Sequence, residues 1–115
     1  MKATIYHYRD ADGRMYFGCG EPWDGAALTK VAEVEASDLD DAYMRTNHIE
    51  SDWTLGEGVE LVPFSGRRGE NRHRSTSIGD VIIFNDRSYV VETCGFGELE
   101  GDEWQAFMKN VREAV

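Results

Sequence analysis

The chain is 115 residues long and 41% hydrophobic, which is typical of one folded domain that buries its own core without a metal ion or a disulfide. Twelve lysines and arginines against 22 aspartates and glutamates give a formal charge of −10. This excess argues against direct nucleic-acid binding, because that affinity comes from cations that neutralise phosphates. The sequence has no run of about 18 apolar residues and so also argues against a membrane-spanning helix.

Two aromatic and β-branched segments near the N-terminus predict a β-hairpin. Residues 3–9 and 15–19 flank Asp12-Gly13, which is among the stronger hairpin-turn pairs. The aromatic side chains of these segments are either cross-strand packing pairs, the interpretation we favour, or a platform for a ligand. Residues 28–35 come after a glycine-rich loop and predict a further strand, because apolar residues alternate over part of the run.

Ser37 begins the clearest predicted helix. Ser37 is a good N-cap residue, and Asp40 three positions later completes a capping-box pattern. Asp38 and Asp41 also lie in the first turn, where carboxylates favour the positive end of the helix dipole. These three aspartates therefore have a structural explanation, and the alternative is that they also bind a partner. The helix is expected to end at Asn47-His48.

A basic loop interrupts the acidic chain after a short predicted strand at residues 59–62. The loop spans residues 65–74, is expected to be flexible, and holds Arg67, Arg68, Arg72 and Arg74. Subtracting these four arginines and Glu70 from the totals leaves 8 basic and 21 acidic residues, a charge of −13 for the rest of the chain. The loop either folds onto this acidic surface, which we favour, or forms a second interaction site with Trp53 that binds phosphate or RNA.

The densest apolar run predicts a central β-hairpin. Val81–Phe84 is wholly apolar, as in a strand that is buried on both faces. Asn85 and Asp86 tolerate left-handed backbone and predict a turn, and residues 89–93 predict the second strand. Polar residues before the hairpin can hydrogen-bond their own backbone and fix its direction. Among them Ser77 is not expected to be a nucleophile, because the sequence has no G-x-S-x-G elbow and no placed base.

Residues 98–115 predict a second, strongly amphipathic helix. Trp104, Phe107, Met108 and Val111 repeat at helical spacing and are expected to face the core, or alternatively a dimer partner. Four acidic residues crowd the start of this helix, where they favour the helix dipole. They are Glu98, Glu100, Asp102 and Glu103.

Cysteine and histidine spacing gives no sign of a metal or redox site. Cys19 and Cys94 are the only cysteines; they lie in strand-like runs and predict reduced core residues in a cytoplasmic protein. His48 has no cysteine, histidine or paired carboxylate at ligand spacing. We therefore expect no cofactor and no metal, and the lack of a nucleophile with a base argues against an enzyme.

The middle half of the chain resembles small accessory proteins carried by phages, plasmids and integrated elements, including YodL-like domains. The shared pattern is a Thr-Asn pair, a tryptophan, a short strand, Arg-Ser-Thr-Ser-x-Gly-Asp-Val, a hydrophobic hairpin and Gly-Phe-x-x-Leu. In this chain the elements are Thr46-Asn47, Trp53, Val59–Val62, Arg74–Val81, Gly95-Phe96 and Leu99. The resemblance implies a mobile-element origin and little about chemistry. The N-terminal hairpin, the loop from Arg67 to Arg74 and the C-terminal helix depart from the pattern.

These features predict a single α+β domain, a mostly antiparallel sheet with two amphipathic helices packed at one side of it. For function, we expect a non-catalytic acidic protein from a phage or mobile element. It would occupy a basic surface of a host defence or nucleic-acid-processing complex, as an anti-CRISPR or antirestriction inhibitor does. The expected binding carboxylates are Asp38, Asp40, Asp41, Glu98, Glu100, Asp102 and Glu103. The alternative is a structural or regulatory module, homodimeric or bound to another protein, that acts by sheet-edge pairing.

Overall fold

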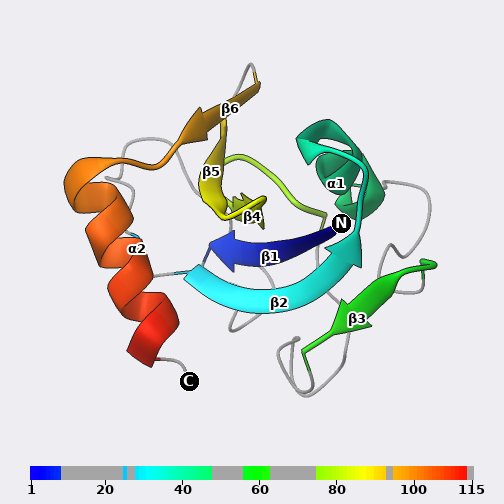
Figure 1. Cartoon of the computed structure of the whole chain (residues 1–115), viewed down its shortest axis with the longest axis horizontal. Helices are drawn as coiled ribbons and strands as arrows, with labels where there is room; N and C mark the ends of the chain where they lie inside the picture. The colour runs from blue at the N-terminus through cyan, green and yellow to red at the C-terminus, as the bar shows by residue number, and fades with distance from the viewer. Residues whose placement is uncertain (9–24, 26–27, 48–55, 63–74, 93–94, 114–115) are drawn as a thin grey trace.

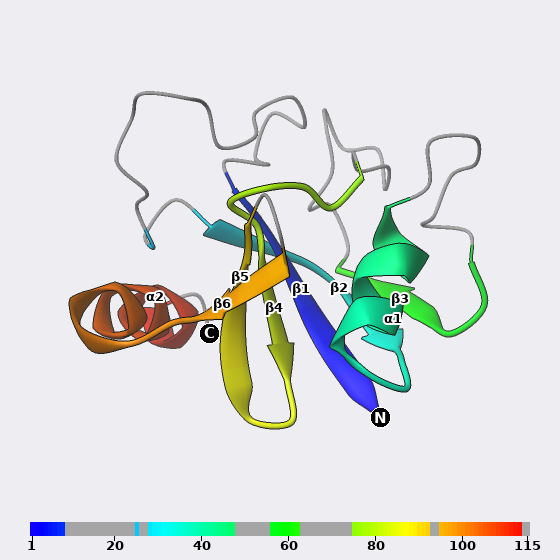
Figure 2. The same cartoon turned by 90° about the horizontal axis from the view of Figure 1, so that it is seen from above.

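Six strands form one antiparallel sheet, and a helix lies on each of its faces (Figures 1 and 2). The computed structural model describes residues 1–8, 25, 28–47, 56–62, 75–92 and 95–113. The strand order across the sheet is β3-β2-β1-β4-β5-β6. In chain order, the elements are β1 (Lys2–Tyr8), β2 (Leu28–Glu35), α1 (Leu39–Thr46), β3 (Val59–Leu61), β4 (Val81–Phe84), β5 (Arg87–Glu92), β6 (Gly95–Glu98) and α2 (Gly101–Glu113). The predicted α+β class is confirmed.

Strand β1 lies in the middle of the sheet, and its alternating side chains build a core on both faces. Ala3 and Ile5 face α1, whereas Tyr6 and Tyr8 face α2, and all four are buried. The ring of Tyr6 meets that of Phe107 from α2 edge to face, with centroids 5.0 Å apart. The sequence prediction that both helices share one side of the sheet was therefore wrong, because β1 is apolar on both faces and each face needs a cover.

The predicted pairing of residues 3–9 with residues 15–19 is also wrong where it can be checked. Antiparallel pairing joins β1 to β2 along Lys2–Tyr8, and β4 occupies the other side of β1 along Ala3–Tyr6. Both edges of this part of β1 are therefore filled. Residues 15–19 themselves lie outside the described residues. The strands predicted at 28–35 and 59–62 are confirmed as β2 and β3.

The central hairpin is confirmed as β4 and β5, which pair from Val81 opposite Val90 to Phe84 opposite Arg87. Its two turn residues, Asn85 and Asp86, have φ angles of 52° and 64°. Positive φ at both central residues is the geometry of a type I′ turn, whose twist matches that of the flanking strands. Ile82 is fully buried, whereas Ile83 and Phe84 are half-buried.

A buried polar network holds the segment before β4 against the end of β1. The carboxylate of Asp80 is fully buried and accepts hydrogen bonds from the backbone N–H groups of Tyr8 and Ser77, both at 2.7 Å. His7 Nε2 lies 3.0 Å from Thr76 Oγ1 and 3.9 Å from Asp80 Oδ2. Two side chains of the Ser-Thr-Ser-x-Gly-Asp part of the sequence pattern thus have a structural role, since Asp80 accepts backbone N–H groups and Thr76 bonds to His7.

The first helix begins one residue later than the sequence predicted. Asp38, not Ser37, is the N-cap residue, and its Oδ1 accepts the N–H of Asp41 at 2.7 Å. Ser37 instead donates its N–H to Asp41 Oδ2 at 2.9 Å. The cap is shifted by one position, because aspartate reaches the third backbone N–H as well as serine does. Asp41 accepts the N–H of the residue before the cap, so the predicted reciprocal capping box does not form. The predicted end at Asn47 is confirmed as the C-cap.

The second helix begins at Gly101 rather than at residue 98. Residues 95–98 form the edge strand β6, which pairs with β5 and contains Glu98. Phe107 is fully buried and Met108 and Val111 pack beside it, as the predicted apolar stripe requires. Trp104, which was predicted to face the core, is 42% exposed. It lies in the first turn of α2.

Several predicted features lie outside the described residues. They are the two cysteines, His48, Trp53 and the loop at residues 65–74. In the described part of the chain, no helix is long and apolar enough to cross a membrane.

Candidate protein-binding surface at the start of helix α1

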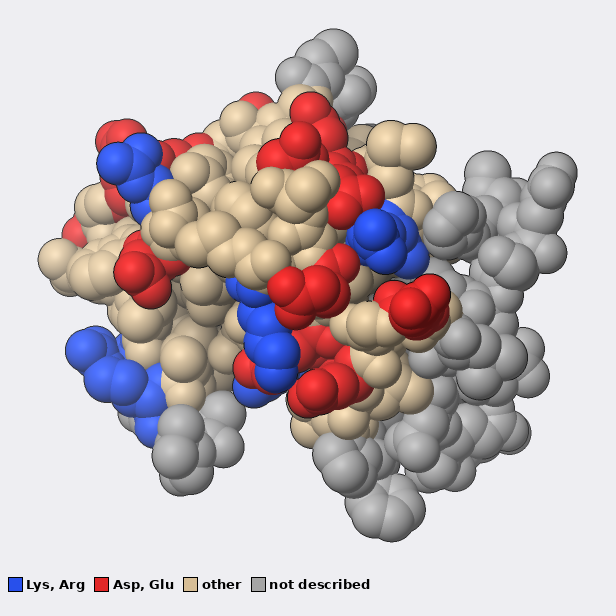
Figure 3. Space-filling view, turned by 45° about the vertical axis from the view of Figure 1, so that its right-hand side comes forward, with Lys and Arg blue, Asp and Glu red and all other residues tan. Residues whose placement is uncertain are grey.

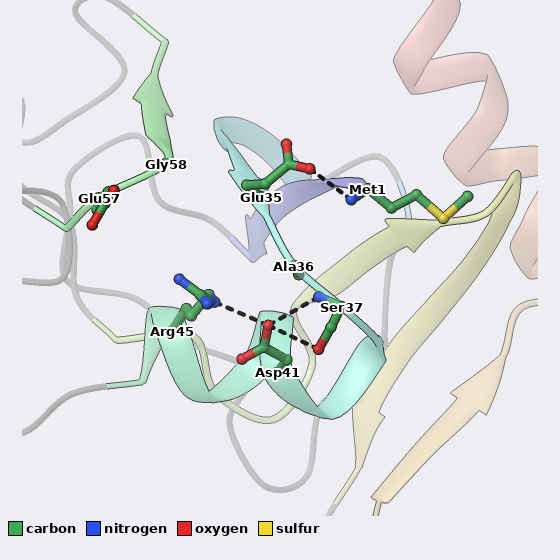
Figure 4. Close-up of a pocket in the computed structure, with 8 residues that line it drawn as sticks. All are labelled: Met1, Glu35, Ala36, Ser37, Asp41, Arg45, Glu57 and Gly58. Carbon is green, nitrogen blue, oxygen red and sulfur yellow. Dashed lines mark hydrogen bonds and ion pairs between the residues drawn. The ribbon is translucent and has the colours of Figure 1, made fainter.

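An open hollow of about 620 Å³ lies where the first residue of the chain, the end of β2, the start of α1 and the turn before β3 meet. Figure 4 shows two groups of bonded residues in it: Glu35 with the amino group of Met1, and Asp41 with Ser37 and Arg45. The lining residues are Met1, Glu35, Ala36, Ser37, Asp41, Arg45, Glu57 and Gly58. Three of them carry carboxylates, against the cations of Arg45 and the Met1 amino group, so the described lining has a net charge of −1.

Asp41 is the most firmly held of these carboxylates. Its Oδ2 accepts hydrogen bonds from the N–H of Ser37 at 2.9 Å, from the hydroxyl of Ser37 at 3.2 Å and from Arg45 Nε at 3.0 Å. The Ser37 N–H, followed by the Arg45 side chain, lowers the pKa of Asp41 below its ordinary value. Asp41 therefore contributes a fixed negative charge, and it is also part of the helix start.

Glu35 lies at the end of β2 on the opposite wall of the hollow. Its Oε1 accepts a hydrogen bond from the amino group of Met1 at 2.6 Å. This bond and the positive charge of the amino group lower the pKa of Glu35. The backbone N–H of Glu35 also donates to Gly58 O at 2.9 Å, which ties the turn before β3 to the end of β2.

Gly58 brings Glu57 to the rim. Its φ of +78° belongs to the left-handed region, and a Cβ there would lie 3.1 Å from Glu35 Cβ. A larger residue would therefore push the turn away from β2. Glu57 is exposed and forms no hydrogen bond or ion pair with another described residue. The same is true of Asp40, in the first turn of α1.

Together, Glu35, Asp38, Asp40, Asp41 and Glu57 form what we call the α1 acidic surface. In Figure 3 red carboxylate side chains gather on the side of the molecule that carries α1 and β3. The nearby cations are already engaged: the Met1 amino group with Glu35, Arg45 with Asp41, and Lys2 with Glu33 at 3.8 Å and Glu60 at 3.6 Å. The unpaired carboxylates of this surface are consequently available to a cationic partner.

The seven carboxylates expected from the sequence do not form one surface. Asp38, Asp40 and Asp41 belong to α1, whereas the other four lie at β6 and the start of α2, on the other side of the molecule (Figure 1). Within the α1 group, Asp38 and Asp41 are used by the helix cap and only Asp40 is unpaired. In the α2 group, Glu98 lies 3.5 Å from Arg87 Nη1, and Glu100, Asp102 and Glu103 are exposed.

Sequence reasoning missed Glu35 and Glu57 as members of the site. Residue 57 lies between two glycines, which signalled only a turn. Nothing in the sequence places that turn against the end of β2, because the contact depends on the pairing of β3 with β2.

A second hollow of about 480 Å³ lies between β2 and α2. Tyr6 lines it, and burial, followed by the charge of Glu33, raises the pKa of Tyr6.

The α1 acidic surface is open, and its carboxylates are exposed, paired or engaged in capping. Among the described residues that line its hollow there is no histidine, cysteine or lysine. Across the described ranges, no three histidine, cysteine, aspartate or glutamate side chains are grouped so that they could hold a metal ion. His7 and Asp80 are close together but fully buried, so they do not reach a substrate.

Comparisons with known proteins found no matching family model and no similar curated protein or solved structure.

Proposed function

We propose that this chain is a non-catalytic, cytoplasmic protein-binding domain that occupies a basic surface of a host protein. In its specific form, the proposal is an inhibitor from a phage or mobile element that acts on a defence or nucleic-acid-processing complex, of the anti-CRISPR or antirestriction type. The partner would use the same lysines and arginines to hold nucleic acid. The domain itself would bind neither nucleic acid nor membrane and would need no cofactor.

The observation that carries this proposal is the arrangement of the α1 acidic surface. Asp40 and Glu57 are unpaired with respect to the described residues. Glu57 lines the same hollow as Asp41 and Glu35, whose pKa values are lowered, and Asp40 precedes Asp41 in the first turn of α1. Carboxylates held on a helix and a sheet can receive arginine side chains in the planar, bidentate manner in which phosphates do. The formal charge of −10 adds long-range attraction toward a cationic partner.

The resemblance of the middle of the chain to accessory proteins of mobile elements supports the choice of a host protein as the partner. The residues that carry this resemblance at 75–81 serve the buried network of Asp80 and not the acidic surface. They would therefore preserve the fold, while the surface of α1 sets the choice of partner.

The structure also leaves room for the alternative of sheet-edge pairing. β3 and β6 each have one neighbouring strand in the described part of the sheet. A homodimer or a regulatory module would use one of these edges. Such pairing depends on backbone groups, so it would respond little to the removal of charges on α1.

The test compares two charge-neutralised proteins that differ only in where charge is lost. One is Asp40→Asn with Glu57→Gln on the α1 acidic surface, and the control is Glu100→Gln with Asp102→Asn near α2. Both pairs are exposed, so both proteins should fold. A nucleic-acid-binding partner captured from a host lysate is then purified, and its association rate is measured against salt concentration.

We expect the α1 variant to associate about three- to tenfold more slowly at low salt, because surface charges act mainly on the encounter rate. The association rate of the control variant should fall by less than half as much. The difference should shrink above physiological salt, where exposed charges more than about 8 Å apart are screened. Equal rates for wild type and the α1 variant would refute a role for this surface.

A further inference from the structure

The hydrogen bonds of β5 show which residues of the edge strand β6 point their backbone N–H and C=O groups away from the sheet. Leu99 donates its N–H to Ser88 O at 2.8 Å, and Val91 bonds through both its N–H and its C=O to the β4 side, at Asp80 and Gly79. In an antiparallel ladder, residues alternate between facing the partner strand and facing away. With Val91 opposite Phe96, the backbone groups of Phe96 and Glu98 must point away from β5.

These outward groups are unused within the described part of the chain. Neither Phe96 nor Glu98 has a backbone partner on that side, and β5 is the only strand that the described sheet places next to β6. An added antiparallel strand could exchange about four hydrogen bonds with the two residues, two with each. Such an edge is a ready template for strand addition.

Carboxylates flank this edge on both faces of the sheet. Glu98 is on the face that carries Phe96; its side chain is exposed and lies 3.5 Å from Arg87 Nη1, in an exposed ion pair that a basic partner side chain would compete with. On the other face, Glu92 Oε1 occupies the space that a Cβ on Gly97 would fill, so the carboxylate lies across the glycine. The exposed acidic side chains of Glu100 and of the first turn of α2 follow directly in the chain.

From this arrangement we infer that β6 accepts an extended basic segment of a partner protein as a seventh, antiparallel strand. Side chains of opposed residues lie on the same face. A lysine or arginine opposite Glu98 therefore faces that carboxylate, and the next residue, opposite Gly97, faces Glu92. Two adjacent basic residues would each meet one carboxylate, one on either face. A second copy of this chain is disfavoured, because it would bring Glu98 and Glu92 toward their own duplicates.

This site is separate from the α1 acidic surface, although it shares with the proposed function a basic partner. The probe is a short, terminally blocked, fluorescent peptide with two adjacent arginines flanked by valine and threonine. Its control is the same peptide methylated on alternate backbone nitrogens, which keeps every charge but removes the donors that pair with an edge. Binding is measured by fluorescence anisotropy at physiological salt.

Two variants of one residue separate backbone pairing from charge. Glu98→Pro removes an outward N–H at a position where an edge strand tolerates proline, and Glu98→Gln removes only the charge. We expect Glu98→Pro to weaken binding of the unmethylated peptide at least about tenfold. Glu98→Gln should weaken it about two- to fivefold, the range of an exposed ion pair. Asp40→Asn with Glu57→Gln should leave peptide binding within about twofold, so this site can fail or succeed independently of the α1 surface.

The methylated peptide decides the question even if Glu98→Pro does not fold. Loss of binding on methylation supports strand addition. Equal binding of the two peptides would overturn the inference, because charge attraction alone would then explain it. A fall in the sedimenting mass of the protein on Glu98→Pro substitution would also overturn it, since the edge would then hold a second copy.

Discussion

Replacing Asp80 with alanine should remove the group that joins the end of β1 to the start of β4. The carboxylate is fully buried and receives two backbone N–H groups at 2.7 Å, from Tyr8 and Ser77. A buried donor left without an acceptor costs about 1–3 kcal/mol. Tyr8 is fully buried and should incur the full cost, whereas water can reach the half-buried Ser77. We therefore expect a loss of about 3 kcal/mol.

The assay is equilibrium unfolding in urea followed by tryptophan fluorescence. With a slope of about 1.5 kcal/mol per molar urea, a typical value for a small domain, the midpoint should fall by about 2 M. Asp80→Asn keeps one acceptor oxygen and should lose roughly half as much. The matched control is Asp86→Asn in the exposed turn, where asparagine also tolerates a φ of 64°. If Asp80→Ala unfolds within about 0.5 M urea of wild type, the network does not stabilise the fold as argued.

Three further predictions concern the core and the first helix. Ile82→Ala should cost about 2–5 kcal/mol, and Ile83→Ala clearly less, since Ile82 is fully buried and Ile83 half-buried; equal urea midpoints would contradict the assignment of the core. Asp38→Ala should lower the free energy of unfolding by about 0.5–2 kcal/mol and Ser37→Ala by less, because Asp38 is the N-cap. A larger loss for Ser37→Ala would instead support Ser37 as the N-cap. The pKa of Asp41 is lower in the folded protein than in the unfolded chain, where it is near 3.8. The carboxylate therefore stabilises the fold at pH values above the unfolded pKa, and this contribution is lost as the pH falls through the folded pKa. Thermal midpoints measured from pH 6 to pH 2 should accordingly fall less in Asp41→Asn than in wild type, and parallel curves would contradict the bonds to Ser37 and Arg45.

The local parts of the fold follow from the sequence, and the long-range parts do not. Val81–Phe84 with Asn85 and Asp86 predicts a hairpin because the run and its turn chemistry are adjacent in the chain. The partner of β1 was predicted wrongly, because the Asp12-Gly13 turn signal outweighed the possibility that β2 and β4 flank β1. The start of α2 was predicted three residues early, because the acidic run is continuous in sequence although Glu98 belongs to a strand.

The candidate surface shows the same division. Asp38, Asp40 and Asp41 could be predicted to be exposed because they occupy one helical turn. Glu57, which lines the same hollow as Asp41, could not be predicted, since its position depends on the glycine turn that packs on the end of β2. Charge counting likewise could not show that the two acidic groups lie on different sides of the molecule (Figure 1).

The most direct test of the central claim is competition for the partner. A purified nucleic-acid-binding partner captured by this chain is saturated with labelled duplex DNA, and the chain is titrated in while the anisotropy of the DNA is followed. If the chain occupies the surface that holds phosphates, wild type should displace the DNA fully, and Asp40→Asn with Glu57→Gln should require about three- to tenfold more protein. A ternary complex that keeps the DNA bound at saturating wild-type protein would contradict the account.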